Sequence, residues 1–129
     1  MNLIGAGRTL YLKNDPAGPH LWFVLTDPDS VTDQVVIVRV VTARQYTDKT
    51  LVLAAGVHPF VKQDSNVEYG SAKFQPVTAL NRAINTGKCK LDADMSPALL
   101  QDVRRGLLAS ARTVHFIADH CKRCFPPCP

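Results

Sequence analysis

The sequence lacks any apolar run long enough to cross a membrane. Stretches such as Leu21–Leu25 are far shorter than the roughly 20 residues that a spanning helix needs. The N-terminus also lacks the charged and apolar regions of a signal peptide. Charged residues make up 20% of the chain and apolar residues 46%, a balance that excludes fibrous and disordered classes. We therefore expect a cytoplasmic globular protein that has no membrane partner.

The length of 129 residues suits one domain with its own hydrophobic core and is too short for two ordinary ones. No internal repeat divides the sequence. The net charge of +4 favours an anionic partner, because Lys and Arg side chains steer phosphate-bearing or acidic molecules toward the surface. Many basic domains bind no nucleic acid, so the charge alone leaves RNA, DNA and acidic proteins open as partners.

The first two thirds of the chain has the composition and alternation of short strands. The expected strands are Thr9–Lys13, His20–Thr26, Val35–Thr42, Leu51–Ala54 and Asn66–Phe74. Val35–Thr42 is nearly all apolar, which predicts a central strand with Val38 on one face and Arg39 on the other. Five short strands joined by tight turns indicate a small barrel or sandwich.

The last third of the chain changes to helical spacing. Val77–Ile84 predicts a short helix, and a second helix is expected to start at Ser96, a good N-cap, with Pro97 at its first position. The apolar face of the second helix consists of Leu99, Leu100, Val103, Leu107 and Leu108. We expect no regular structure in the tail His120–Pro129, because of its prolines.

Three segments resemble the MazF/PemK family of ribonuclease toxins. The first is His20–Leu25, where the family has an Arg-Pro pair followed by an apolar run. The second is Val40–Arg44, a strand that ends in Thr42 and is followed closely by a basic residue. The third runs from Asp64–Ser65 to Leu80, where the family has an Asp-Ser or similar pair, a strand and a short helical turn.

The resemblance covers residues 8–112 and implies a mainly β fold with a C-terminal helix, a small SH3-like barrel of about five to seven short strands. We therefore expect a barrel domain over residues 1–112 and a Cys/His/Pro-rich extension over residues 113–129. The implied activity is that of a toxin of a type II toxin–antitoxin pair, a metal-independent, sequence-selective endoribonuclease. Such an enzyme cleaves single-stranded RNA and leaves 2′,3′-cyclic phosphate and 5′-hydroxyl ends. The implied partners are the RNA substrate, a cognate antitoxin and a second copy of the chain in a homodimer.

The sequence departs from the family at the position of the catalytic arginine, where it has His20. Histidine gives and takes a proton near neutral pH more readily than arginine, so the substitution is compatible with catalysis. The loop Asn14–Pro19 is also shorter than the family's loop, which gates RNA and contacts the antitoxin. The resemblance makes Thr42 the residue that hydrogen-bonds the phosphate or the 2′-oxygen.

Cleavage of RNA without a metal needs a base, an acid and a positive charge beside the phosphate. His58 is the candidate for a second proton carrier beside His20. Lys62 or Arg44 is the candidate for the charge that stabilises the phosphorane. The remaining candidate RNA contacts are Arg39, Ser65 and Tyr69.

Each candidate also has a structural interpretation. His58 precedes a proline and is suited to capping a turn, while Tyr69 and Trp22 are suited either to stacking on bases or to a buried core. Arg39, alone among valines, is placed to reach RNA or to pair with a carboxylate at a subunit boundary. Thr42, at the end of a strand, is also an ordinary β-former.

Three of the four cysteines lie in the tail, with the spacing Cys121-x2-Cys124-x3-Cys128 and with His120 adjacent. Cysteines of a cytoplasmic protein argue against structural disulfides. Thiolates and imidazoles are preferred zinc ligands, so one interpretation is a zinc site at these four residues. The other is a reduced tail without a metal, and no other cofactor is expected.

Three functional interpretations follow from the sequence. The first is the toxin nuclease, and the second is a non-catalytic SH3-like module that binds nucleic acid or a peptide, with His20 marking lost catalysis. The third is a structural component whose apolar helix face mediates assembly. Cleavage of RNA in EDTA separates the first two, and the third predicts neither RNA binding nor toxicity.

Overall fold

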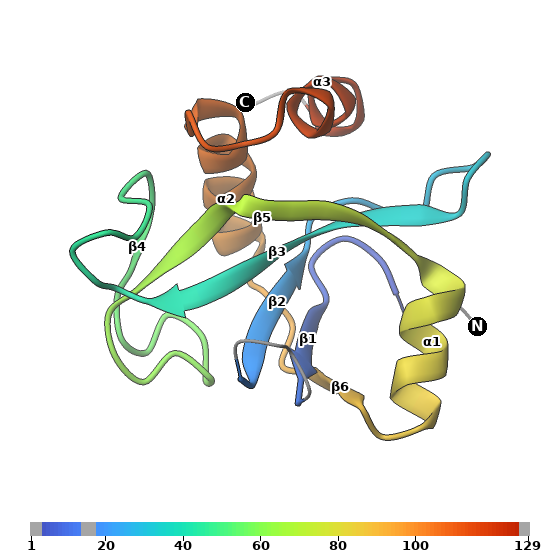
Figure 1. Cartoon of the computed structure of the whole chain (residues 1–129), viewed down its shortest axis with the longest axis horizontal. Helices are drawn as coiled ribbons and strands as arrows, with labels where there is room; N and C mark the ends of the chain where they lie inside the picture. The colour runs from blue at the N-terminus through green and yellow to red at the C-terminus, as the bar shows by residue number, and fades with distance from the viewer. Residues whose placement is uncertain (1–3, 14–17, 127–129) are drawn as a thin grey trace.

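The computed structural model describes residues 4–13 and 18–126, which form an antiparallel sheet curled into a half-barrel and three helices (Figure 1). The strands are β1 (Thr9–Leu12), β2 (His20–Val24), β3 (Gln34–Thr42), β4 (Val52–Leu53), β5 (Ser65–Pro76) and β6 (Cys89–Asp92). The helices are α1 (Val77–Asn85), α2 (Pro97–Ala109) and α3 (His115–Cys124). The fold is mainly β with a C-terminal helix, as the sequence predicts.

The strand order in the sheet is β4-β5-β3-β2-β1-β6. β3 lies between β5 and β2 and is antiparallel to both, so the prediction of a central strand is confirmed. Its alternation is confirmed as well, because Val38 packs in one core cluster while its neighbour Ile37 packs in another. Central position and burial on both faces explain why this segment is nearly all apolar.

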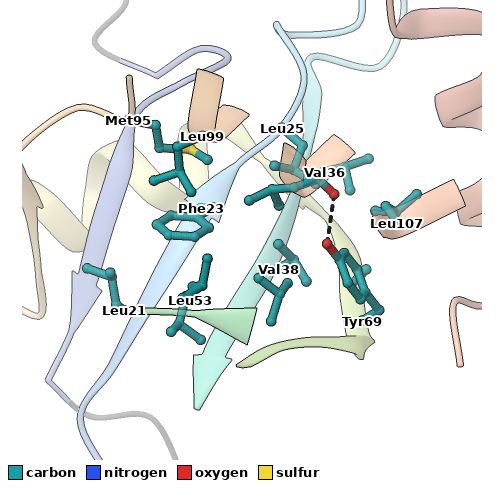
Figure 2. Close-up of a cluster of buried hydrophobic side chains, with 14 of the residues drawn as sticks. Leu21, Phe23, Leu25, Val36, Val38, Leu53, Tyr69, Met95, Leu99 and Leu107 are labelled. Carbon is teal, nitrogen blue, oxygen red and sulfur yellow. Dashed lines mark hydrogen bonds between the residues drawn. The ribbon is translucent and has the colours of Figure 1, made fainter. Parts of the chain in front are cut away.

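Two cores lie on opposite faces of the sheet. The larger core joins one face to α2 and α3, and its members include Leu21, Phe23, Val38, Tyr69 and Leu107 (Figure 2). The smaller core lies on the other face beside α1, and its members include Leu10, Trp22, Ile37, Val77 and Leu80. Helices therefore cover much of both faces of the sheet. The ends of the strands are the parts that remain open to solvent.

α2 begins as the sequence predicts. The Ser96 hydroxyl oxygen accepts a hydrogen bond from the backbone N–H of Leu99 at 3.1 Å, and Pro97 occupies the first turn. Val103 and Leu107 are buried along the same face, whereas Leu108 is 40% exposed. In the part of the chain that the structure describes, no helix combines the length and the apolar composition that crossing a lipid bilayer requires.

The structure corrects the expectation for the tail. His120–Pro129 was expected to be irregular, yet residues 120–124 form the second half of α3. The prolines at 126, 127 and 129 follow the helix, and Phe125 is already extended ahead of Pro126. Ile117 and Cys121 of α3 enter the larger core. Pro126 therefore follows the end of the helix and does not prevent it.

Candidate functional site

A cleft of about 400 Å³ opens at one end of the sheet, where β2 begins and β3 ends. It is lined by residues 19–21 and 40–42 of these strands, by the loop residues 60–63 and by Ser65 at the start of β5. Four of the eight predicted site residues meet in this cleft: His20, Thr42, Lys62 and Ser65. The other four lie elsewhere in the fold.

His20 is the first residue of β2 and is half-buried. Its Nδ1 lies 2.8 Å from the carbonyl oxygen of Gly18, a residue with a φ of 102° that only glycine adopts readily. A carbonyl oxygen can only accept, so Nδ1 carries the proton and donates it. In the neutral ring the lone pair is then on Nε2, the nitrogen that would act as a general base.

The hydroxyl group of Thr42 lies 3.4 Å from the side-chain nitrogen of Gln63, which donates to it. A hydroxyl group that accepts one hydrogen bond still has its own hydrogen to donate. Ser65 lies directly across the strands from Thr42, but it is buried and donates its hydroxyl hydrogen to the carbonyl oxygen of Gln63 at 2.9 Å. Thr42 is therefore better placed than Ser65 to contact a phosphate.

His20 and Thr42 belong to opposite faces of the sheet. Leu21 pairs with Val40, so the alternation of β3 puts Thr42 on the face of Leu21. The alternation of β2 puts His20 on the face of Trp22. The two residues line the same cleft because both stand at the end of the sheet, where a ligand can contact both faces at once.

The loop that follows Pro59 supplies the outer wall of the cleft. Lys62 contributes an exposed ammonium group. Phe60 contributes an aromatic ring that is 38% exposed and whose centroid lies 5.1 Å from that of Tyr11. Phe60 and Gln63 were not among the predicted site residues, because no spacing in the sequence marks a loop residue as part of a cleft.

His58 is placed as an anchor of this loop and does not line the cleft. The residue is 2% exposed, and its Nδ1 accepts a hydrogen bond from the backbone N–H of Phe60 at 3.0 Å. Nε2 must then carry the proton, which it donates to the carbonyl oxygen of Ala93 at 2.6 Å. Both ring nitrogens are engaged, so the geometry favours the structural interpretation of His58 over the predicted role in proton transfer.

Tyr69 is fully buried in the larger core (Figure 2). Its hydroxyl group donates to the carbonyl oxygen of Val103 at 2.9 Å, and burial raises the pKa of Tyr69 well above its ordinary value. The ring thus presents no surface to a nucleobase. Trp22 is buried as well, with the Lys73 ammonium 4.9 Å and the Arg39 guanidinium 5.7 Å from its ring centroid.

The two predicted arginines lie outside the cleft. Arg39 forms an ion pair with Glu68 of the neighbouring strand, 2.5 Å from Nη2 to Oε1, so its carboxylate partner belongs to the same chain. Arg44 is exposed two residues beyond Thr42, and its Nη1 donates to the carbonyl oxygen of Ala43 at 3.3 Å. Of the two arginines, Arg44 is closer in sequence to a residue that lines the cleft, Thr42.

The predicted zinc ligands point to different environments. Cys121 lies in the larger core, where burial, with a smaller contribution from Cys124, raises the pKa of its thiol to about 12. Cys124 is exposed, and its Sγ lies 3.2 Å from Nε2 of His120. Cys128 lies outside the described residues. Among the residues that are described, no three His, Cys, Asp or Glu side chains are grouped to hold a metal, and the zinc site stays a prediction.

The cleft joins an imidazole, a hydroxyl group and an ammonium group at one end of the sheet. Groups of these kinds can bind a phosphodiester and transfer the protons that its cleavage requires. The family of the chain is not shown by comparison, since no protein-family model and no curated protein sequence matches it.

Proposed function

We propose that this protein is a metal-independent, sequence-selective endoribonuclease of single-stranded RNA and the toxin of a type II toxin–antitoxin pair. The observation that carries the proposal is the cleft in which His20, Thr42 and Lys62 meet. The curled antiparallel sheet and the C-terminal helices support the proposed relation to the SH3-like barrels of the MazF/PemK family. The sequence segments that resemble the family support it as well.

The proposed reaction is an attack of the 2′-oxygen of RNA on the adjacent phosphorus. Nε2 of His20 takes the proton of the 2′-hydroxyl group as the new bond forms. The hydroxyl group of Thr42 donates to a non-bridging oxygen, and the ammonium group of Lys62 balances the charge of the phosphorane. The bond to the 5′-oxygen then breaks, and this oxygen takes a proton from solvent, which gives the 2′,3′-cyclic phosphate and the 5′-hydroxyl end.

The proposed partners follow from the same function. The chain would act in the cytoplasm as a homodimer, and the acidic tail of a cognate antitoxin would occupy the cleft that RNA otherwise fills. Light scattering of the purified protein tests the dimer. Rescue of growth by an adjacent small acidic reading frame, when both are expressed together, tests the antitoxin.

The test of the nuclease is cleavage of mixed single-stranded RNA in EDTA. His20→Ala and Thr42→Ala should each lower the rate by about 10²-fold or more, since each removes a group that acts on the transition state. His115→Ala is the matched control, because this histidine is exposed on α3, away from the cleft. Full activity of the His20→Ala variant would remove His20 from the mechanism.

The placement of His58 also favours a second function, binding without cleavage, which the same assay tests. With both nitrogens of His58 engaged, His20 is the imidazole that lines the cleft. A single imidazole is compatible with a module that binds nucleic acid or a peptide without cleaving it. RNA binding without cleavage, together with absence of toxicity on expression, would select this second function.

A further inference from the structure

Charged residues of opposite sign gather at the two ends of the sheet. β1 and β3 finish at the end with the cleft, and β2, β5 and β6 start there. The exposed cations at or just beyond these strand ends are Lys13, Arg44, Lys49, Lys62, Lys88 and Lys90. The acidic residues beside the opposite strand ends are Asp27, Asp29, Asp33, Asp92 and Asp94. The electrostatic field of the protein therefore attracts anions to the cleft end.

Each end also has residues of the other sign, among them Asp48 and Asp64 at the cleft end and Arg8 and Arg104 at the acidic end, where Nε of Arg104 donates to the carbonyl oxygen of Leu25 at 3.0 Å. Asp64 is exposed beside the cleft, where its Oδ1 accepts from the backbone N–H of Ala55 at 3.3 Å. Arg8 lies at the acidic end, where its Nε is 3.2 Å from Oδ1 of Asp94. These residues do not reverse the sign of either end, because the six cations of the cleft end and the five carboxylates of the acidic end outnumber them.

The lysines of β1 and β6 continue the basic surface away from the cleft. Leu12 pairs with His20 on one side and with Cys89 on the other, so β1 carries the surface from the cleft to β6. Just beyond these pairs, the backbone N–H of Lys13 donates to the carbonyl oxygen of Lys88 at 3.1 Å. Lys88 and Lys90 therefore lie at and just before β6, on the side of β1 that faces away from His20 and the cleft.

An aromatic pair lies between the cleft and these lysines. Phe60 lines the cleft, and its ring contacts Tyr11 of β1. Tyr11 is directly opposite Lys90, and residues directly opposite each other in a sheet share a face. The order along this face is thus the cleft, Phe60 with Tyr11, and then Lys90.

Hydrogen bonds and packing hold the loop that carries Phe60 in place. Its backbone N–H is held by His58, and the ends of its loop are joined by a hydrogen bond of 2.8 Å from the N–H of Gly56 to the carbonyl oxygen of Val61. Val61 anchors the loop in the larger core. A partly exposed ring on a held loop next to lysines has the properties of a stacking platform for an unpaired base.

We propose that a single strand of RNA crosses this end of the sheet from the cleft to β6. One nucleobase stacks on Phe60, and the phosphates that follow are held by Lys88 and Lys90. This path rests on the proposed function for the identity of its ligand, and it adds a subsite for the nucleotides beside the scissile phosphate.

The test measures binding of a non-cleavable strand, a 2′-O-methyl RNA of about ten nucleotides that carries one 2-aminopurine, a length comparable to single-strand sites of small barrels. Lys88→Glu with Lys90→Glu should weaken binding by about tenfold, and the slope of log K against log salt should fall by about 1.4, or about 0.7 for each lost phosphate contact. Lys122→Glu with Arg123→Glu is the control, since these exposed cations lie on α3. The control should bind as tightly as the wild type or nearly so.

The stacking step has its own readout. Quenching of 2-aminopurine on binding should disappear in Phe60→Ala and persist in Phe60→Tyr, which keeps an aromatic ring. Equal quenching in Phe60→Ala, or equal loss of affinity in the α3 control, would overturn the path.

The two proposals fail separately. Cleavage that is unaffected by Lys88→Glu with Lys90→Glu leaves the nuclease intact and overturns the path. Binding that depends on Phe60, Lys88 and Lys90 without any cleavage of natural RNA supports the path and rejects the nuclease. Absence of RNA binding by the wild type rejects the path outright.

Discussion

A Cβ atom added to Gly106 would stand 2.0 Å from the hydroxyl oxygen of Tyr69. That hydroxyl group donates to the carbonyl oxygen of Val103, one turn earlier in α2. The tyrosine of β5 thus reaches under the helix and fills the space that a side chain would need. α2 packs on the sheet at a distance that only glycine at position 106 allows.

Gly106→Ala should therefore destabilise the protein although alanine favours helices. The gain in helix propensity is about 1 kcal/mol, whereas forcing an extra carbon into a packed core costs about 1–3 kcal/mol or more. We expect the free energy of unfolding, measured in urea, to fall by about 2 kcal/mol. Tyr69→Phe combined with Gly106→Ala should recover only part of this loss, because a ring carbon remains 2.6 Å from the added atom. A neutral or stabilising Gly106→Ala would contradict this packing.

Substitution of His58 should affect stability more than proton transfer. His58→Ala removes a buried ring and leaves the N–H of Phe60 and the carbonyl oxygen of Ala93 without their partner, which should cost about 3 kcal/mol. His58→Asn, which retains an acceptor near Nδ1, should lose less than His58→Ala. The proposed nuclease activity should fall in His58→Asn through misplacement of the cleft loop, while the shape of the pH–rate profile stays that of the wild type. A changed limb of that profile would instead make His58 a proton carrier.

Asp48 should make the protein sensitive to acid. Burial acts to raise its pKa, but hydrogen bonds from Ser110 at 2.6 Å and from Thr50 outweigh burial. With the nearby charge of Arg112, they hold the pKa of Asp48 below its ordinary value of 3.8. The unfolded chain thus binds a proton at a higher pH than the folded chain, so this stabilisation is present above pH 3.8 and is lost as the pH falls through the lowered pKa.

Unfolding in urea at pH 7 and at successively lower pH measures this loss. Asp48→Asn should be less stable than the wild type at pH 7, and the difference should shrink as the pH drops below 3.8. Asp102→Asn is the control, because this carboxylate is about half-exposed on α2. A gap between Asp48→Asn and wild type that stays constant over the whole range would show that the charge of Asp48 is not the stabilising feature.

The cysteines should differ sharply in reactivity. Burial raises the pKa of Cys89 to about 11 and that of Cys121 to about 12, so both hold their protons and are shielded from reagents. Cys124 is exposed beside His120. Brief treatment of the native protein with iodoacetamide should label Cys124, and peptide mass spectrometry should find Cys89 and Cys121 labelled only after unfolding. Rapid native labelling of Cys121 would mean that α3 leaves the core.

The sequence by itself determined the elements whose pattern is local. The nearly continuous apolar run Val35–Thr42 sufficed to predict β3 and its central place, because a strand buried on both faces has no polar side to present. Ser96 and Pro97 sufficed to predict the start of α2, since an N-cap acts on the residues that follow it directly. The resemblance to family motifs predicted Thr42 and His20 as site residues, and both line the same cleft.

Only the tertiary structure decided the elements and roles that depend on distant contacts. β6 has four residues and exists as a strand because β1, at the far end of the sequence, pairs with it. The second half of α3 holds its shape because Ile117 and Cys121 are buried, a packing term that the prolines of the tail concealed. His58 and Tyr69 are of residue types that are common in functional sites, but both side chains are buried in the fold. A residue's type is written in the sequence, whereas its access to a ligand depends on what packs against it.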